Sequence, residues 1–213
     1  MSKDVATVSP MEDDATLREV RFLSSQEIVA IGDRGVVWRS TDGGETWSFV
    51  HVPTSASLRG MHFVTNQVGW IVGRDVAPYT QVSTGVVLYT EDGGRTWKRR
   101  GTQALPGLES VQFFGPEQGI AVGDSSADFP SGIIETSDGG QTWRAVEGAG
   151  AEGWEALACF GPQEGVVSGV RGGHGVIGQG RLMPLPPDFG LPGMHGVSVD
   201  ATGRGWMVGD GAL

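Results

Sequence analysis

The 213-residue sequence contains very little cysteine and no long hydrophobic run. Cys159 is the only cysteine, which excludes an intrachain disulfide and a metal site built from thiolates, and its expected role is that of a small buried hydrophobic residue. No segment approaches the roughly 18 apolar residues of a membrane span, and residues 1–14 lack the charged-then-apolar pattern of a secretory signal. We therefore expect a soluble chain without direct membrane insertion, and its residues alone do not indicate a compartment.

Positive charge is also scarce. The 25 acidic residues outnumber 15 basic ones and give a net charge of −10, which argues against a nucleic-acid backbone as the main partner. The single basic cluster is residues 98–100, which fits a solvated strand end about as well as a docking patch. The four histidines lack metal-ligand spacing, so we expect no metal and no cofactor. They are His51, His62, His174 and His195.

Glycine, in contrast, is abundant, with 36 residues concentrated at expected turns. Three octets share an Asp-Gly-Gly turn followed by Thr and Trp. They are Ser-Thr-Asp-Gly-Gly-Glu-Thr-Trp at 40–47, Thr-Glu-Asp-Gly-Gly-Arg-Thr-Trp at 90–97 and Thr-Ser-Asp-Gly-Gly-Gln-Thr-Trp at 136–143. Their aspartates lie 50 and 46 residues apart, which is the period of a stacked supersecondary unit.

Each octet predicts a tight hairpin, because the carboxylate accepts bonds from the backbone N–H groups that follow and glycine supplies positive φ. The Trp then enters a strand and covers the flank of the hairpin as an anchor. A catalytic or metal-binding role would need a partner set at three separate places, so we expect a structural role. The residues concerned are Asp42, Gly44, Thr46, Trp47, Asp92, Gly94, Thr96, Trp97, Asp138, Gly140, Thr142 and Trp143.

Five repeated units are visible beyond the octets. Each contains a first strand, a second strand bounded by glycine five or six residues later and, in the complete units, a third strand that runs into the octet and a fourth that starts at its Trp. The first strands end at Phe22, Phe63, Phe113, Phe160 and Val199. Four strands at this period describe a propeller blade, so we expect an all-β Asp-box β-propeller of four-stranded blades.

The units are expected at 17–57, 58–107, 108–153, 154–193 and 194–213, after an N-terminal tail at 1–16. The fourth unit has no Asp-Gly-Gly turn, and the fifth stops where its third strand would begin. We therefore expect about four blades and part of a fifth, in an incomplete ring. Residues 5–8 of the tail form a candidate ring-closing strand.

At the octets the sequence resembles the Asp-box (BNR) repeat, Ser/Thr-x-Asp-x-Gly-x-Thr-Trp. Coupled with an upstream Gly-Trp-x-Val-Gly, it resembles the photosynthesis system II stability and assembly factor family over residues 17–213. That resemblance implies a non-catalytic propeller that binds a protein partner, such as photosystem or other membrane-complex subunits, in the thylakoid lumen or the periplasm.

The expected binding face is the one that carries the connections between second and third strands, opposite the boxes. These connections differ in length, and uneven loops on a rigid scaffold are the usual place for recognition. Their candidate partner-binding residues are Arg74, Asp75, Tyr79, Gln81, Asp128, Phe129 and Arg171. The first-strand residues Arg21, His62, Gln112 and Cys159 are expected at equivalent positions, either packed between blades or facing a central binding surface.

A sialidase-like glycoside hydrolase, or the structural Asp-box domain of one, is the alternative. It would need an arginine cluster to hold a substrate carboxylate and a nucleophile with an acid or base partner. Tyr79 with Asp75 is the one pair that we consider, and no catalytic residue is assigned. Three arginines converging on one pocket would favour the hydrolase, whereas an open face would favour the binding protein.

Overall fold

The computed structural model describes residues 14–80, 82–148, 153–169, 173–185, 194–200 and 204–209. Four four-stranded antiparallel sheets and a two-stranded sheet follow one another along the chain, and each has its strands in chain order. The first two are β1 (Leu17–Phe22), β2 (Ile28–Gly32), β3 (Val37–Ser40) and β4 (Ser48–Phe49), then β5 (Ser57–Phe63), β6 (Gly69–Val76), β7 (Ser83–Thr90) and β8 (Lys98–Arg99). A 3-10 turn, η1 (Asp33–Gly35), joins β2 to β3.

The third sheet contains β9 (Leu108–Phe113), β10 (Gly119–Gly123), β11 (Ile133–Thr136) and β12 (Arg144–Ala145). The fourth contains β13 (Ala156–Gly161), β14 (Glu164–Ser168), β15 (His174–Gly178) and β16 (Arg181–Pro184), and the last pair is β17 (Met194–Val199) with β18 (Gly205–Gly209). The predicted all-β propeller of four-stranded blades is confirmed. The candidate strand at residues 5–8 lies outside the described residues.

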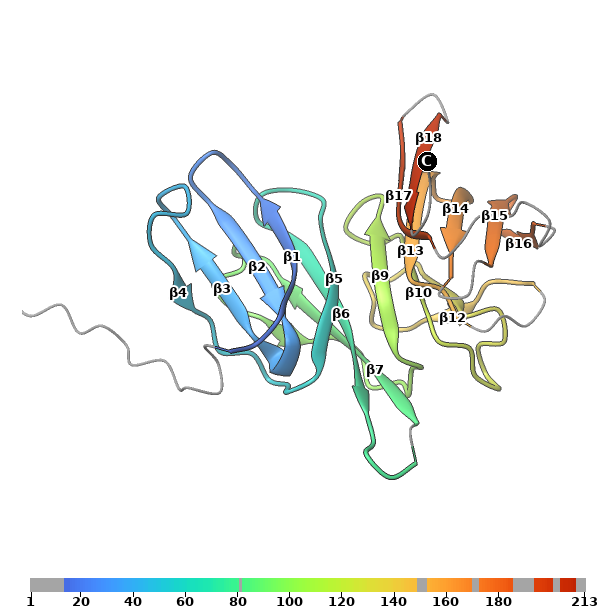
Figure 1. The fold of residues 1–213 in the computed structure, drawn as a ribbon, viewed down its shortest axis with the longest axis horizontal. Coiled ribbons are helices and arrows are strands. Elements are labelled where there is room, and N and C mark those ends of the chain that lie inside the picture. Colours follow the sequence, from blue (N-terminus) through green and yellow to red (C-terminus); the bar gives the residue numbers. More distant parts are fainter. Residues whose placement is uncertain are drawn as a thin grey trace, which may run out of the picture.

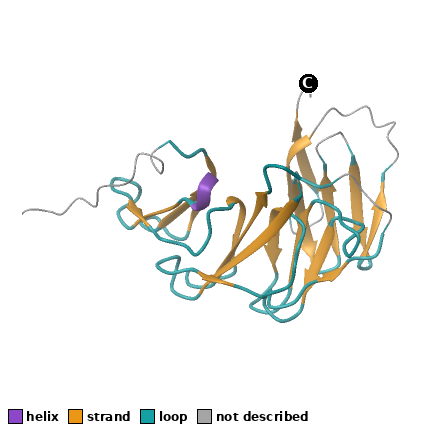
Figure 2. Cartoon of the chain, turned by 90° about the horizontal axis from the view of Figure 1, so that it is seen from below, coloured by secondary structure: helices purple, strands orange, loops and turns teal. Residues whose placement is uncertain are grey.

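The sheets stand side by side in an arc, and the first strand of each contacts the first strand of the next (Figures 1 and 2). Three apolar clusters fill the spaces between consecutive sheets. The cluster between the second and third sheets contains Trp70 and Val72 from β6 and Val111 and Phe113 from β9. The core therefore lies between blades, and the second and third sheets each bury apolar residues on both of their faces.

Each box turn is held by its aspartate. In the second sheet, Asp92 Oδ1 accepts a bond from the Thr96 backbone N–H at 2.9 Å, and Asp92 Oδ2 accepts one from the Thr96 hydroxyl at 2.6 Å. The Thr90 hydroxyl also donates to Asp92 Oδ1, at 2.8 Å. Gly93 and Gly94 have φ values of 72° and 78°, which glycine adopts at no steric cost. The aspartate thus closes the hairpin as the sequence predicts.

Hydrogen bonding also changes the acidity of the box aspartates. Bonds from the Thr46 side chain and backbone lower the pKa of Asp42 to about 2. Burial acts to raise the pKa of Asp138, but bonds from Thr142 and Thr136 outweigh it and lower that pKa to about 2. These carboxylates therefore stay ionised, and keep their full acceptor strength, well below neutral pH.

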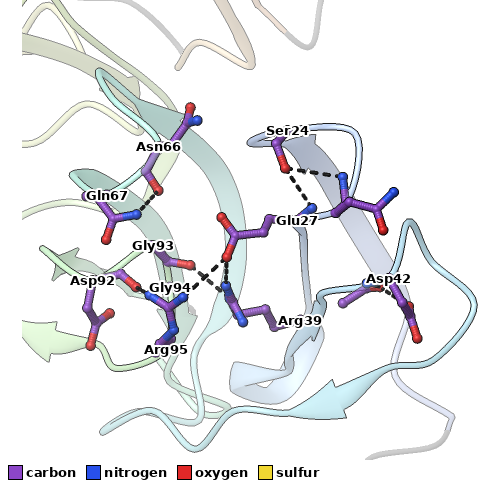
Figure 3. A network of polar contacts seen from close by, with 12 residues as sticks. Ser24, Glu27, Arg39, Asp42, Asn66, Gln67, Asp92, Gly93, Gly94 and Arg95 are labelled. Atoms are coloured by element: carbon purple, nitrogen blue, oxygen red, sulfur yellow. Dashed lines mark hydrogen bonds and ion pairs between the residues drawn. The ribbon is translucent and has the colours of Figure 1, made fainter.

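The boxes are also tied to the preceding sheet. Arg39 of β3 donates its Nε–H to the Gly93 carbonyl of the next box at 3.0 Å, and its guanidinium pairs with Glu27 (Figure 3). Arg95 of that box reaches the same Glu27 carboxylate at 3.3 Å. One sheet edge and the following box therefore share a single charged network.

The three box tryptophans differ in burial, although the sequence predicts three equivalent anchors. Trp97 and Trp143 are buried in the clusters between sheets, whereas Trp47 is 39% exposed. The reason is positional: Trp97 packs against the first sheet and Trp143 against the second, and no sheet within the described residues precedes the first. Trp47 occupies the same position in its box as Trp97 and Trp143, but no described sheet packs against it.

The fourth sheet has no box, as predicted. Gln179 and Gly180 alone connect β15 to β16, with φ values of 53° and 71°. Two consecutive positive φ values fit the two-residue turn that matches the twist of antiparallel strands. This sheet therefore forms its outer hairpin without an aspartate.

Replacing Asp92 by Ala should lower the free energy of unfolding by about 1–2 kcal/mol, because it leaves the Thr96 N–H and both threonine hydroxyls without their acceptor. Urea unfolding followed by tryptophan fluorescence measures this loss. The control is Asp128→Ala in an exposed loop, which should change stability by no more than about 0.5 kcal/mol. Equal losses in both variants would contradict a structural role for the box.

Candidate functional site: the central hollow and the neighbouring hairpin

The hairpin of β6 and β7 extends beyond the body of the second sheet, at the end opposite the box turns (Figure 1). Its ladder continues to Val76 opposite Ser83, and the Ala77 N–H donates to the Val82 carbonyl at 3.0 Å to close the tip. Tyr79 at the tip is 97% exposed. Val76, Val82 and Asp75 are also exposed, so this hairpin offers an apolar tip with an acidic flank.

Arg74 makes ion pairs with the neighbouring sheet, and its role as a contact residue stays a prediction. Its guanidinium pairs with Glu109 at 2.7 Å and with Asp124 at 3.1 Å, both from the third sheet and its connection. The Ser83 hydroxyl of β7 bonds to the same Asp124 carboxylate. Arg74 therefore joins the base of the hairpin to the neighbouring sheet.

The other predicted loops contribute less. Asp128 is exposed, as a contact residue should be, but Phe129 is buried in the cluster between the second and third sheets. A tight turn with paired backbone bonds between Ser126 and Phe129 directs the ring inward. Phe129 is thus a core residue, which is a correction to the prediction. Gln81 and Arg171 lie outside the described residues.

A central hollow of about 510 Å³ lies where the first strands meet, and it is lined by β1, β5, β9, β13 and β17. Its lining is rich in charged and polar side chains. They include Arg18, Glu19, Arg21, Arg59, His62, Glu109 and Gln112. The hollow adjoins the β6–β7 hairpin, because Glu109 lines it and pairs with Arg74 at the hairpin base.

The residues Arg21, His62 and Gln112 occupy equivalent positions, as predicted, and each bridges to the next sheet. Arg21 donates to the Met61 carbonyl at 3.2 Å, and His62 Nδ1 accepts from the Phe113 N–H at 3.3 Å. Gln112 Nε2 donates to the Cys159 carbonyl at 2.8 Å, and Gln112 Oε1 accepts from the Cys159 N–H at 2.9 Å. These side chains line the hollow while they hold neighbouring first strands together.

Cys159 does not belong to that set. It pairs with Gly165 in the ladder as Phe113 pairs with Gly119, so Cys159, and not Phe160, corresponds to the earlier phenylalanines. An added Cβ at Gly165 would lie 2.6 Å from the Cys159 sulfur, which explains why position 165 is a glycine. Burial raises the pKa of the Cys159 thiol to about 12, and the thiol is therefore unreactive at neutral pH.

Three arginines line the hollow, but each already has a carboxylate partner. Arg18 pairs with Asp33 at 2.7 Å, Arg21 with Glu19 at 2.8 Å and Arg59 with Glu109 at 3.5 Å. The bond from Arg18 lowers the pKa of Asp33. The three arginines of the lining are therefore already paired with carboxylates, unlike an arginine clamp that is free to bind a substrate carboxylate.

The sequence argument missed Arg18, Arg59 and Glu109. A signal was present: each directly follows a leucine, at 17, 58 and 108, that pairs with the last glycine of the second strand. Alignment on the phenylalanines hid this relation, because the register shifts at the bulge just after these leucines. The pairing of the strands, which the sequence does not display, places Arg18, Arg59 and Glu109 at equivalent positions.

In the described part of the chain, no group of three or more His, Cys, Asp or Glu residues is arranged to hold a metal ion. Tyr79 and Asp75 lie on the exposed hairpin, away from the hollow lining, and a phenol that is 97% exposed has no desolvated surroundings to activate it.

Among the described helices, none is long and apolar enough to cross a membrane.

Comparisons with known proteins agree with the fold. The BNR/Asp-box repeat family matches residues 38–49, which contain the first box. A structure of YCF48 bound to D1 peptide is similar with a TM-score of 0.68 and 22% identity, over 92% of this chain and 61% of that one. YCF48 from Cyanidioschyzon merolae has a TM-score of 0.66 and 19% identity, over 91% of this chain and 64% of that chain.

A GH74 enzyme from Niastella koreensis is similar with a TM-score of 0.64 and 16% identity, over 87% of this chain and 32% of that one. No curated protein sequence matches at a significant level. This chain spans less than two thirds of the YCF48 structures that it matches. At these identities the likeness supports the β-propeller fold.

His62 should make stability depend on pH. Burial, assisted by the nearby Arg21 charge, lowers its pKa from 6.5 to about 4, so the unfolded chain binds a proton before the folded protein does. The contribution of neutral His62 to the free energy of unfolding is complete above pH 6.5. It is lost as the pH falls toward 4, by up to about 1.4 kcal/mol per pH unit. Urea unfolding across this window measures the slope.

The matched variant is His62→Gln, because Gln112 makes the equivalent bridge to the next sheet without titrating. It should have a smaller slope of stability against pH than the parent protein over the same window. An unchanged slope would show that His62 is not the source of the pH dependence of stability.

The two parts of the hairpin should respond differently to mutation. Arg74→Ala should cost about 1–3 kcal/mol of stability, because it removes the arginine partner of two partly buried carboxylates, whereas Tyr79→Ala should cost nothing measurable. Thermal unfolding compares the two variants. If Arg74→Ala were as stable as the parent, the ion pairs of Arg74 would contribute nothing to stability. A structural role for Arg74 would then be contradicted.

Proposed function

We propose that this chain is a non-catalytic protein-binding propeller that acts as a scaffold in the assembly of a membrane complex. The partner segment binds at the end of the arc where the central hollow and the β6–β7 hairpin lie together. The observation that carries this proposal is the lining of the hollow, in which three arginines are each paired with a carboxylate.

A lining of paired charges suits a peptide. Arg21 is partly exposed and its Nη2 bonds to a backbone carbonyl and to Glu19, so a peptide carboxylate or carbonyl can share that guanidinium without leaving a buried charge alone. The exposed ring of Tyr79 then supplies an apolar contact outside the hollow. Rim charges provide orientation, and the aromatic tip provides affinity.

The comparison with YCF48 bound to D1 peptide supports a partner of the same kind, a subunit of a photosystem or of another membrane complex. Neither a metal nor a cofactor is required for this role. The same resemblance supports action in the thylakoid lumen or the periplasm.

The alternative is a glycoside hydrolase, which the GH74 neighbours keep in consideration. It requires a carboxylate pair with separated acid and base roles across a sugar site. Two carboxylates of the hollow are instead engaged with arginines, Glu19 with Arg21 and Glu109 with Arg59 and Arg74. The observations therefore favour binding over hydrolysis.

Affinity capture from the source lysate tests the proposal with four baits. They are the parent chain, a variant with residues 77–82 replaced by a Gly/Ser linker, Arg21→Glu and the control Arg144→Glu. Arg144 is exposed on β12, outside the hollow. Membrane-complex subunits should be recovered with the parent and the control and lost, by about tenfold or more, with the other two.

The recovered subunit is then tested as a purified protein by titration with the same four chains. Equal binding to all four would contradict the proposed face. A folded bait that recovers no partner but releases sugar from xyloglucan or a sialoside would establish the hydrolase instead.

A further inference from the structure

Arg59 differs from the other two arginines of the hollow in its hydrogen bonds. Arg18 donates one bond of 3.0 Å and one of 2.7 Å to the Asp33 carboxylate. Arg21 donates to a carboxylate at 2.8 Å and to a backbone carbonyl at 3.2 Å. Within the described residues, the Arg59 guanidinium donates no hydrogen bond, and its Nε is buried without a partner. Of these three arginines, Arg59 alone keeps its donors unused.

The charge of Arg59 is nevertheless balanced. Glu109 Oε2 lies 3.5 Å from Arg59 Nε, which is an ion pair without a hydrogen bond. The other oxygen of Glu109 accepts a bond of 2.7 Å from Arg74 at the base of the hairpin. Glu109 is therefore held by Arg74, while it compensates the charge of Arg59 and leaves the N–H groups of Arg59 available.

The backbone fixes the place of Arg59. The register of β5 against β6 shifts between Leu58 and Gly60, so Arg59 is the extra residue of a bulge, and bulges redirect a side chain. An added Cβ at Gly60 would lie 2.9 Å from the Glu109 carbonyl oxygen and from Ser110 Cα, so glycine lets β5 approach β9 closely. The Arg59 side chain is 27% exposed and lines the hollow.

Unused donors beside a balanced charge select a neutral acceptor. A ligand that brings an acceptor gains a bond to Arg59 without breaking another hydrogen bond within the protein. A ligand carboxylate would have to lie near the Glu109 carboxylate, where two like charges repel. A peptide carbonyl brings an acceptor oxygen without a charge. The chemistry around Arg59 therefore favours the main chain of a peptide over an acidic side chain.

We propose that Arg59 donates a hydrogen bond to a backbone carbonyl of the peptide that enters the hollow. This inference rests on the proposed function, because it names the chemical group that the hollow recognises in its partner. The Arg59 Nε is buried, so the peptide reaches the guanidinium through its Nη groups. Backbone carbonyls occur in every peptide, so Arg59 contributes affinity for a main chain, and selection among side chains belongs to other contacts.

Nuclear magnetic resonance of the arginine side chains tests the chemistry without the natural partner. N-methylacetamide, which carries one peptide carbonyl, is titrated into the full chain, and acetate is titrated separately as the charged acceptor. The Arg59 guanidinium signals are identified by their loss in Arg59→Met. They should shift progressively with N-methylacetamide and stay in place with acetate. The exposed Arg144, which is bonded to Glu135, reports nonspecific effects and should shift less.

A shift of the Arg59 signals with acetate alone, with both probes equally or with neither would overturn the proposal. Acetate alone would identify a carboxylate as the ligand, and equal shifts would show that Arg59 does not select a neutral acceptor. No shift would show that the guanidinium is inaccessible.

Binding of the recovered membrane-complex subunit is then measured with the parent chain, Arg59→Met and the control Arg144→Met. Arg59→Met should bind about tenfold or more weakly, which is the loss expected for one hydrogen bond to a charged donor, and Arg144→Met should bind as the parent does. Thermal unfolding separates a contact from a structural role. Free Arg59→Met should unfold at the temperature of the parent, because the substitution breaks no hydrogen bond within the described residues.

The outcomes separate this inference from the proposed function. If the subunit binds the parent and Arg59→Met equally, the role of Arg59 is contradicted and the proposed function stands. If Arg59→Met loses stability and keeps its binding, Arg59 is structural, which also contradicts the inference. If the parent binds no subunit, the proposed function fails, and the titration with N-methylacetamide alone decides the role of Arg59.

Discussion

The structure depends on the contact between a box turn and the sheet that precedes it. The aspartate closes its own hairpin, which leaves the carbonyl of the first box glycine pointing outward. That carbonyl accepts a bond from Arg39 at one interface and from Trp70 and Arg100 at the next. A local turn therefore becomes a connection between sheets, and the apolar clusters form where these connections hold the sheets together.

The central hollow follows from this arrangement. Because boxes and clusters fix the outer and middle strands, the first strands meet at the centre with polar side chains that must satisfy one another. Arg21, His62 and Gln112 do so by bonding to the backbone of the next first strand. Arginine–carboxylate pairs complete the lining. In such a surface the polar side chains satisfy one another.

The sequence predicted the repeats well because boxes and glycine-bounded strands are local patterns. It predicted the equivalence of Arg21, His62 and Gln112 but misassigned Cys159, because the irregular end of β13 shifts the register by one residue. A register shift is a property of the ladder and leaves no mark in composition.

The candidate site was harder to predict. Tyr79 is exposed on the loop face as expected, but Phe129 turned inward and Arg74 became an interblade ion pair. Loop residues are ambiguous from sequence, because a phenylalanine or an arginine serves a core or a surface equally well until the neighbouring sheet is in place. The charged lining came from three first strands that lie far apart in the chain.

The fourth sheet, which joins β15 to β16 through Gln179 and Gly180 alone, shows how loosely the repeats constrain one another. In each box, the bonds of the aspartate stay inside its own turn, and the outward bonds reach only the sheet before it. Interactions limited to nearest neighbours let a repeat change without disturbing distant ones. The loss of one box therefore leaves the other three intact, and whole repeats of this type can diverge, or be gained and lost, as separate evolutionary units.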